Sequence, residues 1–101
     1  AVIPERFPGI EGLKPLGQPD DIVPAILDES LIDDRLEVSS EQAAATCVRL
    51  ARLGAFVGPS SGANVHAALH WLERRGAGVV VTLLCDTGER YLSTGMWREA
   101  T

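Results

Sequence analysis

The chain has few lysines, few cysteines and no excess of positive charge. Lys14 is the only lysine among 101 residues, and the net charge is −5. Because the acidic residues are scattered and no basic patch is visible, the sequence argues against binding to nucleic acid or to an anionic membrane surface. The two cysteines, Cys47 and Cys85, have no Cys or His nearby at metal-ligand spacing. We therefore predict neither a disulfide framework nor a metal site.

Long apolar runs are also missing. The longest run, residues 79–85, is interrupted only by Thr82 and is far too short to cross a bilayer. The chain begins with Ala1-Val2-Ile3-Pro4, like the end of a strand, with no initiator Met and no secretory signal pattern. An apolar content of 46% is typical of a globular fold. We expect a soluble cytoplasmic protein that is one domain at most, or a piece of a larger one.

Residues 1–35 predict a long connection, since the stretch 5–30 is rich in Pro and Gly. An α/β core is predicted over residues 36–101. It starts with a brief strand, 36–38, after which Ser39 and Gln42 show the pattern of a capping box. A helix is predicted over 40–53, with Gly54 ending it. Its buried stripe is expected to contain Ala44, Cys47, Val48 and Ala51.

A second helix is predicted from about Gly62 to Arg75, with Gly76 ending it. Residues 79–85 predict a parallel strand that is covered on both faces, because the run is almost entirely apolar. With 55–57 as a further short strand, the order strand, helix, strand, helix, strand indicates βαβ units and a parallel sheet. The buried stripe of the second helix is expected to contain Val65, Ala68, Leu69 and Leu72.

Residues 58–64, Gly-Pro-Ser-Ser-Gly-Ala-Asn, form a turn of small residues between an apolar run and a helix. The free N–H groups of a helix N-terminus can bind an anion or a polar ring atom there. Residues 58–62 also match G-x-S-x-G, the pattern around a hydrolase nucleophile. Asp86 could supply the acid, but His66 and His70 precede it and lie on the helix that the turn opens. No histidine remains to take the proton from Ser60, which disfavours a hydrolase.

Two further sets of residues have both a functional and a structural interpretation. His66 and His70 are spaced i, i+4, as a metal pair on one helix face would be, but no third ligand is evident and a solvated face is expected. Cys85 and Asp86 follow the run 79–85, at the end of a parallel strand where ligands bind. For Cys85, lining a pocket and simple packing both stay open, whereas Cys47 is expected in the core.

Three segments together resemble one enzyme family. They are residues 58–63 (Gly-Pro-Ser-Ser-Gly-Ala), residues 85–95 (Cys-Asp-Thr-Gly-Glu-Arg-Tyr-Leu-Ser-Thr-Gly), and Ile-Val-Pro at 22–24 followed by Ser-Leu-Ile-Asp at 30–33. In this order and spacing they resemble the C-terminal third of cysteine synthase (O-acetylserine sulfhydrylase), a pyridoxal-phosphate enzyme of fold type II. The Cys85-Asp86 pair is closer to the B-type isoenzymes. The resemblance covers residues 1–97 and implies the α/β fold of tryptophan synthase β-like enzymes.

The resemblance also implies a set of cofactor-binding residues. It gives Ser60 a hydrogen bond to the pyridine nitrogen of pyridoxal phosphate. A neutral hydroxyl at that place, unlike a carboxylate, makes the ring a milder electron sink, which suits a β-replacement reaction. The other implied contacts are Ser61 and Gly62, which shape the turn, Cys85 and Asp86 near the ring, and Gly12 at the substrate entrance.

Several parts of the family's site have no match in this chain. The Schiff-base lysine, the loop around the cofactor phosphate and the loop around the substrate carboxylate are all missing from the sequence. The resemblance therefore implies no catalytic residue here, and a partner: the N-terminal part of the enzyme, on the same or another chain. The complete enzyme, expected to be a homodimer, would make L-cysteine from O-acetylserine and a sulfur donor. The alternative is a non-catalytic, truncated α/β module that binds a partner or an anion.

Overall fold

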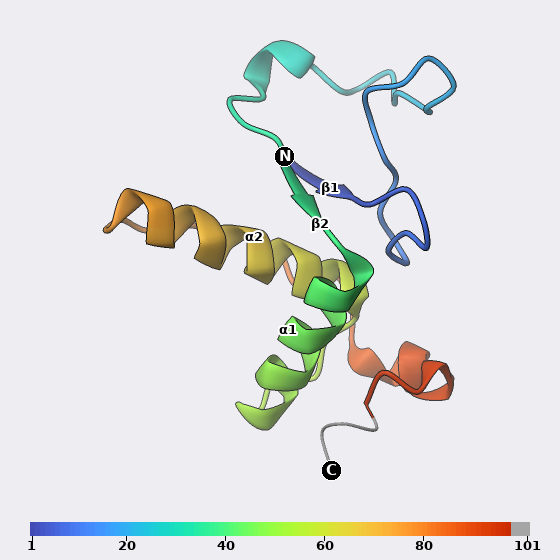
Figure 1. Ribbon diagram of the computed structural model, residues 1–101, viewed down its shortest axis with the longest axis vertical. Helices are drawn as coiled ribbons and strands as arrows, with labels where there is room; N and C mark the ends of the chain where they lie inside the picture. Colours follow the sequence, from blue (N-terminus) through green and yellow to red (C-terminus); the bar gives the residue numbers. More distant parts are fainter. Residues whose placement is uncertain (98–101) are drawn as a thin grey trace.

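The computed structural model describes residues 1–97, which form a small parallel sheet packed on two helices (Figure 1). The strands are β1 (Val2–Pro4) and β2 (Leu36–Val38), and the helices are α1 (Ser40–Arg52) and α2 (Pro59–Arg75). Two 3₁₀ helices complete the elements: η1 (Glu29–Leu31) and η2 (Gly88–Thr94). The α/β class expected from the sequence is therefore confirmed.

The sheet brings the beginning of the chain next to residues 36–38. Strands β1 and β2 are parallel, and Val2 stands opposite Leu36 while Pro4 stands opposite Val38. Both the strand at the start of the chain and the strand at 36–38 were predicted, and both are confirmed. One face of this pair packs on α2. The core that results contains Ile10, Val38, Ala43, Ala63 and Ala67.

Helix α1 follows its predicted bounds and cap closely, but its predicted stripe only in part, because Ala44 and Ala51 are half-buried. The Ser39 side chain accepts a hydrogen bond from the Gln42 N–H, and the Gln42 side chain accepts one from the Ser39 N–H, so the capping box is confirmed. The helix ends at Arg52, and Gly54 follows with a positive φ of 97°. Cys47 is fully buried, as expected.

Helix α2 begins three residues earlier than predicted. Pro59 is its first residue and Gly58 its N-cap, because the fixed φ of proline suits the first turn of a helix. Gly76 ends the helix in the left-handed conformation, as predicted. The predicted stripe is wrong in part: Ala63 and Ala67 face the core, whereas Leu69 is 41% exposed. Of the other stripe residues, Val65, Ala68 and Leu72 are only half-buried.

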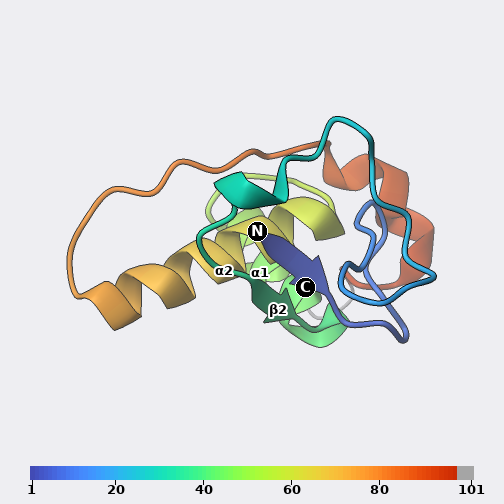
Figure 2. The ribbon, with the colours of Figure 1, turned by 90° about the horizontal axis from the view of Figure 1, so that it is seen from above.

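The strand predicted over residues 79–85 does not form. This segment has no strand structure, and Val79 and Val81 are 91% and 90% exposed. Figure 2 shows it as an extended arm that leaves the end of α2 and returns beside it. A buried central strand needs neighbouring strands and covering layers on both faces, and within residues 1–97 this segment has neither. The short run at 55–57 gives only an isolated bridge, Val57 to Thr87, which is antiparallel.

The connection between β1 and β2 is irregular, as predicted, apart from η1. Arg6 binds Asp21 through two hydrogen bonds of 2.8 and 2.7 Å. These bonds lower the pKa of Asp21 to about 2. The division into a connection (1–35) and a core (36–101) stays a prediction, and residues 98–101 lie outside the described part. No helix within residues 1–97 is long and apolar enough to cross a membrane.

Candidate functional site

The turn at residues 58–62 is the N-terminus of α2 and is buried against the rest of the fold. Ser60 and Ser61 are 4% and 0% exposed, although they occupy the first turn of the helix. The N-cap, Gly58, has no side chain that could bond to the free N–H groups of this turn. Those groups and the helix dipole leave a positive potential beside two buried hydroxyls.

The two serines have different surroundings. Ser61 Oγ accepts a hydrogen bond of 2.8 Å from the Cys85 N–H, so it ties the residue-85 backbone to the helix. Within residues 1–97, Ser60 Oγ makes no hydrogen bond to another group of the protein. Ser60 Oγ is not among the fully enclosed side-chain atoms that lack a partner, so this hydroxyl reaches solvent although the residue as a whole is nearly buried. Ser60 is therefore the hydroxyl that is available to a ligand.

Gly12 lies directly beside Ser60. A Cβ atom added at Gly12 would be 3.5 Å from both Cβ and Oγ of Ser60. Gly12 also has a φ of +90°, which side-chain-bearing residues rarely adopt. The predicted entrance residue and the predicted ring contact are thus brought together, although they are separated widely along the chain. The absence of a side chain at Gly12 keeps the space beside the Ser60 hydroxyl open.

Gly62 faces helix α1 rather than the space beside Ser60. A Cβ atom there would collide with the carbonyl oxygen of Ala43 and with Sγ of Cys47. The Cys47 thiol in turn donates a hydrogen bond of 3.1 Å to the Gly58 carbonyl, and burial raises its pKa to about 11. In this structure Gly62 fixes the close approach of α1 and α2, and its part in cofactor binding stays a prediction.

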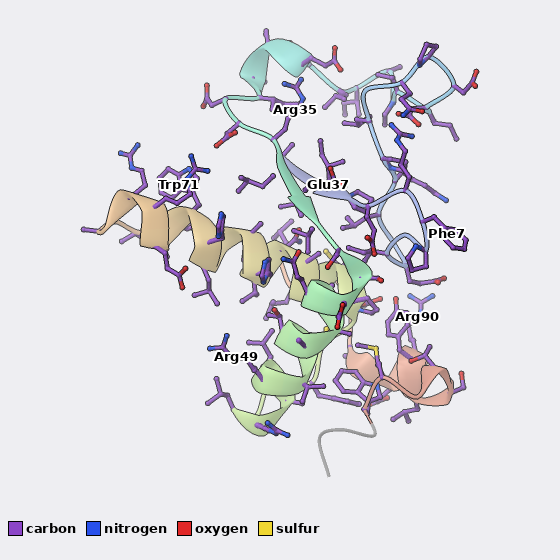
Figure 3. All side chains as sticks on the ribbon, viewed as in Figure 1. Phe7, Arg35, Glu37, Arg49, Trp71 and Arg90 are labelled. Carbon is purple, nitrogen blue, oxygen red and sulfur yellow. The ribbon has the colours of Figure 1, made fainter. Side chains whose placement is uncertain are left out.

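Asp86 lies under the turn and is held by η2. Its Oδ2 accepts a hydrogen bond of 2.6 Å from the Tyr91 hydroxyl and lies 3.7 Å from the Arg90 guanidinium, a side chain that Figure 3 labels. The hydrogen bond to Asp86 raises the pKa of Tyr91 above its usual value. Oδ1 is buried and has no partner within residues 1–97. A Cβ atom at Gly58 would collide with Asp86 and Tyr91, so the glycine there lets the carboxylate approach the helix.

Cys85 sits at the rim of the site. Its side chain is exposed, and its Sγ lies 3.7 Å from Nδ2 of Asn64. The same amide donates a hydrogen bond of 3.0 Å to the Leu83 carbonyl. Sequence reasoning did not single out Asn64 or Tyr91. The position of Asn64 one helical turn after Ser61 was the signal that could have identified it.

The remaining candidates are not bonded to this cluster within residues 1–97. The rings of His66 and His70 are stacked on α2, with 6.5 Å between their centroids. Residues 1–97 contain no group of three His, Cys, Asp or Glu side chains that could hold a metal ion. Lys14 is exposed on the connection. Within residues 1–97, neither the histidines nor the lysine makes a hydrogen bond to Ser60, Ser61 or Asp86.

Comparisons with known proteins agree on one family. Residues 5–86 match the family described as pyridoxal-phosphate dependent enzyme. The chain is similar to a probable cysteine synthase of Bacillus subtilis, with 42% identity over 95% of this chain and 33% of the relative. It is also similar to cysteine synthase B of Escherichia coli, with 39% identity over 95% of this chain and 31% of the relative.

A solved structure supports the same assignment of the fold. The crystal structure of O-ureido-L-serine synthase is similar with a TM-score of 0.74 and 42% identity, covering 88% of this chain and 27% of the other. The chain thus spans about a third of the length of the curated relatives that it matches. The type II fold of these enzymes, expected from the sequence, is confirmed.

Proposed function

Because this chain belongs to the family of pyridoxal-phosphate dependent enzymes, we propose that it is the C-terminal part of a cysteine synthase. The complete enzyme makes L-cysteine from O-acetylserine and a sulfur donor by β-replacement. The observation that carries this proposal is Ser60, a nearly buried residue at the N-terminus of α2 whose hydroxyl has no protein partner within residues 1–97.

The residues around Ser60 fit one edge of a flat, polar ring. A hydroxyl can donate to an unprotonated ring nitrogen, and the missing side chain of Gly12 leaves room for a planar group beside it. The fixed turn behind Ser60 keeps its hydroxyl in place, because Ser61 is bonded to the Cys85 backbone. Ser60 would therefore hold the pyridine nitrogen, with Gly12 against the ring and Cys85 and Asp86 at its margin.

Ser60 sets the protonation of the atom it binds. Pyridoxal phosphate, when bound, supplies an electron sink for negative charge that develops on the amino-acid substrate. An aliphatic hydroxyl keeps its own proton near neutral pH, so Ser60 donates a hydrogen bond without giving up the proton. A carboxylate at this position would instead stabilise a positive charge on the ring nitrogen.

We also propose that this chain is inactive without the remainder of the enzyme. Its only lysine, Lys14, is exposed on the connection between β1 and β2. A lysine that binds the cofactor covalently needs a desolvated pocket that lowers its pKa. Residues from the other two-thirds of the enzyme's length would supply this lysine and the phosphate contacts.

The test combines the chain with the part of the Bacillus subtilis relative that lies outside the matching segment. We expect L-cysteine formation from O-acetylserine and sulfide, and the visible absorbance of bound cofactor, only when both parts are present. Ser60→Ala should lower turnover at least about tenfold, the equivalent of one hydrogen bond of ~1.5 kcal/mol. Ser93→Ala, at an exposed serine of η2, is the control and should leave turnover unchanged.

Two results would count against the proposal. If neither the mixture nor a direct fusion of the two parts binds the cofactor or forms L-cysteine, the enzymatic function is wrong and a non-catalytic module is favoured. If the fusion is active and Ser60→Ala is as active as Ser93→Ala, the function stands but the role of Ser60 is refuted.

A further inference from the structure

The residue that caps helix α2 is contacted from three directions. The Gly58 N–H donates a hydrogen bond of 3.4 Å to the Asp86 carbonyl, and the Gly58 carbonyl accepts one of 3.1 Å from the Cys47 thiol. The Asp86 carboxylate and the Tyr91 ring lie against its Cα atom, where they leave no room for a Cβ atom. Because Ser60 follows in the first turn of the same helix, the groups that fix Gly58 also fix the Ser60 hydroxyl.

The Asp86 carboxylate supplies a charge that α2 lacks at its own N-terminus. Gly58 has no side chain to bond to the first turn, and that turn contains no acidic residue. A negative charge beside the N-terminus of a helix is favourable because it faces the positive end of the helix dipole. Asp86 follows α2 in the sequence, yet its carboxylate contacts the N-cap residue. It therefore supplies from a distance the charge that an aspartate at the N-cap supplies locally.

The two carboxylate oxygens of Asp86 have unequal surroundings. Oδ2 accepts a hydrogen bond of 2.6 Å from the Tyr91 hydroxyl, whereas Oδ1 is buried and has no hydrogen-bond partner within residues 1–97. A buried oxygen without a partner costs free energy, so hydrogen bonds to Oδ1 do not explain the orientation of this carboxylate. The bond from Tyr91 to Oδ2 does explain it, because it leaves Oδ1 turned toward Gly58 at the end of the helix.

Tyr91 is better suited than Arg90 to fix the carboxylate. The Tyr91 side chain belongs to η2 and is 7% exposed. The Arg90 guanidinium lies 3.7 Å from Oδ2, but its side chain is 74% exposed, so water weakens this ion pair. A tyrosine side chain also has only two rotatable bonds to be fixed. Tyr91 is thus the group that orients Asp86.

We propose that Tyr91 is a positioning residue of the cofactor site and acts through Asp86. Its hydroxyl orients the carboxylate, the carboxylate fixes Gly58 at the start of α2, and the first turn of the helix carries the Ser60 hydroxyl. The inference rests on the proposed function, in which Ser60 binds the pyridine nitrogen. Within residues 1–97 Tyr91 makes no hydrogen bond to Ser60, so its effect on the ring is indirect. A small displacement of the Ser60 hydroxyl is enough to weaken its contact with the ring.

The experiment removes the Tyr91 hydroxyl in the direct fusion of this chain with the remaining part of the Bacillus subtilis relative. Tyr91→Phe keeps the ring and removes the hydrogen bond to Asp86. We expect the dissociation constant for pyridoxal phosphate to rise at least about fivefold, the effect of one weakened hydrogen bond. The fluorescence emission maximum of the bound cofactor should shift as well. Turnover should fall by a similar factor, with the KM for O-acetylserine changed less than about twofold.

Thr94→Val is the matched control for a structural effect of η2. The Thr94 hydroxyl lies on the same 3₁₀ helix and also donates a hydrogen bond of 2.6 Å, but to the Tyr91 carbonyl and not to Asp86. This variant should change the dissociation constant for pyridoxal phosphate less than about twofold. The urea midpoints of both variants, measured on the chain, compare their losses of stability.

Two further variants test the route through Asp86. In Asp86→Ala the Tyr91 hydroxyl has no carboxylate to orient, so the addition of Tyr91→Phe should raise the dissociation constant less than about twofold further. If the effects of the two substitutions multiply instead, Tyr91 does not act through Asp86 and the proposal is overturned. If Tyr91→Phe does not fold, Asp86→Asn must show the same loss of cofactor binding, and normal binding in that variant overturns the proposal.

The two proposals fail separately. An active fusion in which Tyr91→Phe and Thr94→Val bind the cofactor equally well overturns the role of Tyr91 and leaves the function standing. A fusion that binds the cofactor and shows the selective loss in Tyr91→Phe, but forms no L-cysteine, supports the role of Tyr91 and overturns the function. A folded fusion that does not bind the cofactor overturns both.

Discussion

Replacement of each of the two neighbouring serines by alanine should separate a structural hydroxyl from a ligand-binding one. Ser61 is fully buried, and its Oγ accepts the Cys85 N–H at 2.8 Å. In Ser61→Ala this N–H loses its acceptor, which costs about 1–3 kcal/mol when water cannot replace it. Because the Cys85 side chain is exposed and water can reach part of this region, we expect a loss of ~1–1.5 kcal/mol in the free energy of unfolding.

Ser60→Ala should have almost no effect on stability. The Ser60 hydroxyl has no hydrogen bond to lose within residues 1–97. Alanine is a better helix former than serine by up to ~0.5 kcal/mol, which offsets small losses of packing. We expect a change of about ±0.5 kcal/mol in the free energy of unfolding.

Urea unfolding of the chain, followed by circular dichroism, measures the difference. With a dependence on urea of about 1.5 kcal/mol per M, the Ser61→Ala midpoint should fall by roughly 0.7–1 M and the Ser60→Ala midpoint by less than roughly 0.3 M. Equal midpoints, or a larger loss in Ser60→Ala, would falsify the distinction between the serines. In that case Ser60 would be a packing residue, and its assignment to the cofactor would lose its main support.

Two further predictions concern the contact between the helices. Gly62→Ala should lower the free energy of unfolding by about 1–2 kcal/mol. Overpacking against Ala43 and Cys47 costs about 1–3 kcal/mol, whereas the higher helix propensity of alanine returns at most ~1 kcal/mol. An unchanged or higher urea midpoint would contradict the close approach of α1 and α2. Burial raises the pKa of Cys47 from 9.0 to about 11, so the unfolded chain ionises first and stability should fall between pH 9 and 11. Cys47→Ala should reduce this loss of stability between pH 9 and 11. A thiol reagent should modify exposed Cys85 well before buried Cys47. Equal modification rates at the two cysteines would argue against the burial of the Cys47 thiol.

The features that could be predicted from the sequence are those that depend on nearby residues. The Ser39–Gln42 capping box and the end of α2 at Gly76 need only a few neighbouring side chains and one special backbone conformation. The contact between Gly12 and Ser60 is different, because it joins distant parts of the chain. It was expected only as two separate roles within a family resemblance. Periodicity alone contains no information on which distant glycine meets the turn.

The predictions that failed depended on partners outside the residues concerned. Residues 79–85 have the composition of a strand, but a strand forms only where a neighbour accepts its hydrogen bonds. The expected stripe of α2 failed for a related reason. Ala63 and Ala67 pack closely against the core, while Leu69 is 41% exposed within residues 1–97. The sequence pattern identifies apolar surfaces that are suited to burial. The structure shows that residues 1–97 bury only some of these surfaces.

The unpaired arm and the free hydroxyl are connected by one hydrogen bond. The Cys85 N–H at the end of the arm binds Oγ of Ser61, the residue next to Ser60 in the first turn of α2. Asn64, on the following turn, binds the Leu83 carbonyl. These two hydrogen bonds therefore join the end of the arm to two side chains of this helix N-terminus. Because a ring contact must be held within a fraction of an ångström to be effective, we expect these two hydrogen bonds also to fix the position of the neighbouring Ser60 hydroxyl.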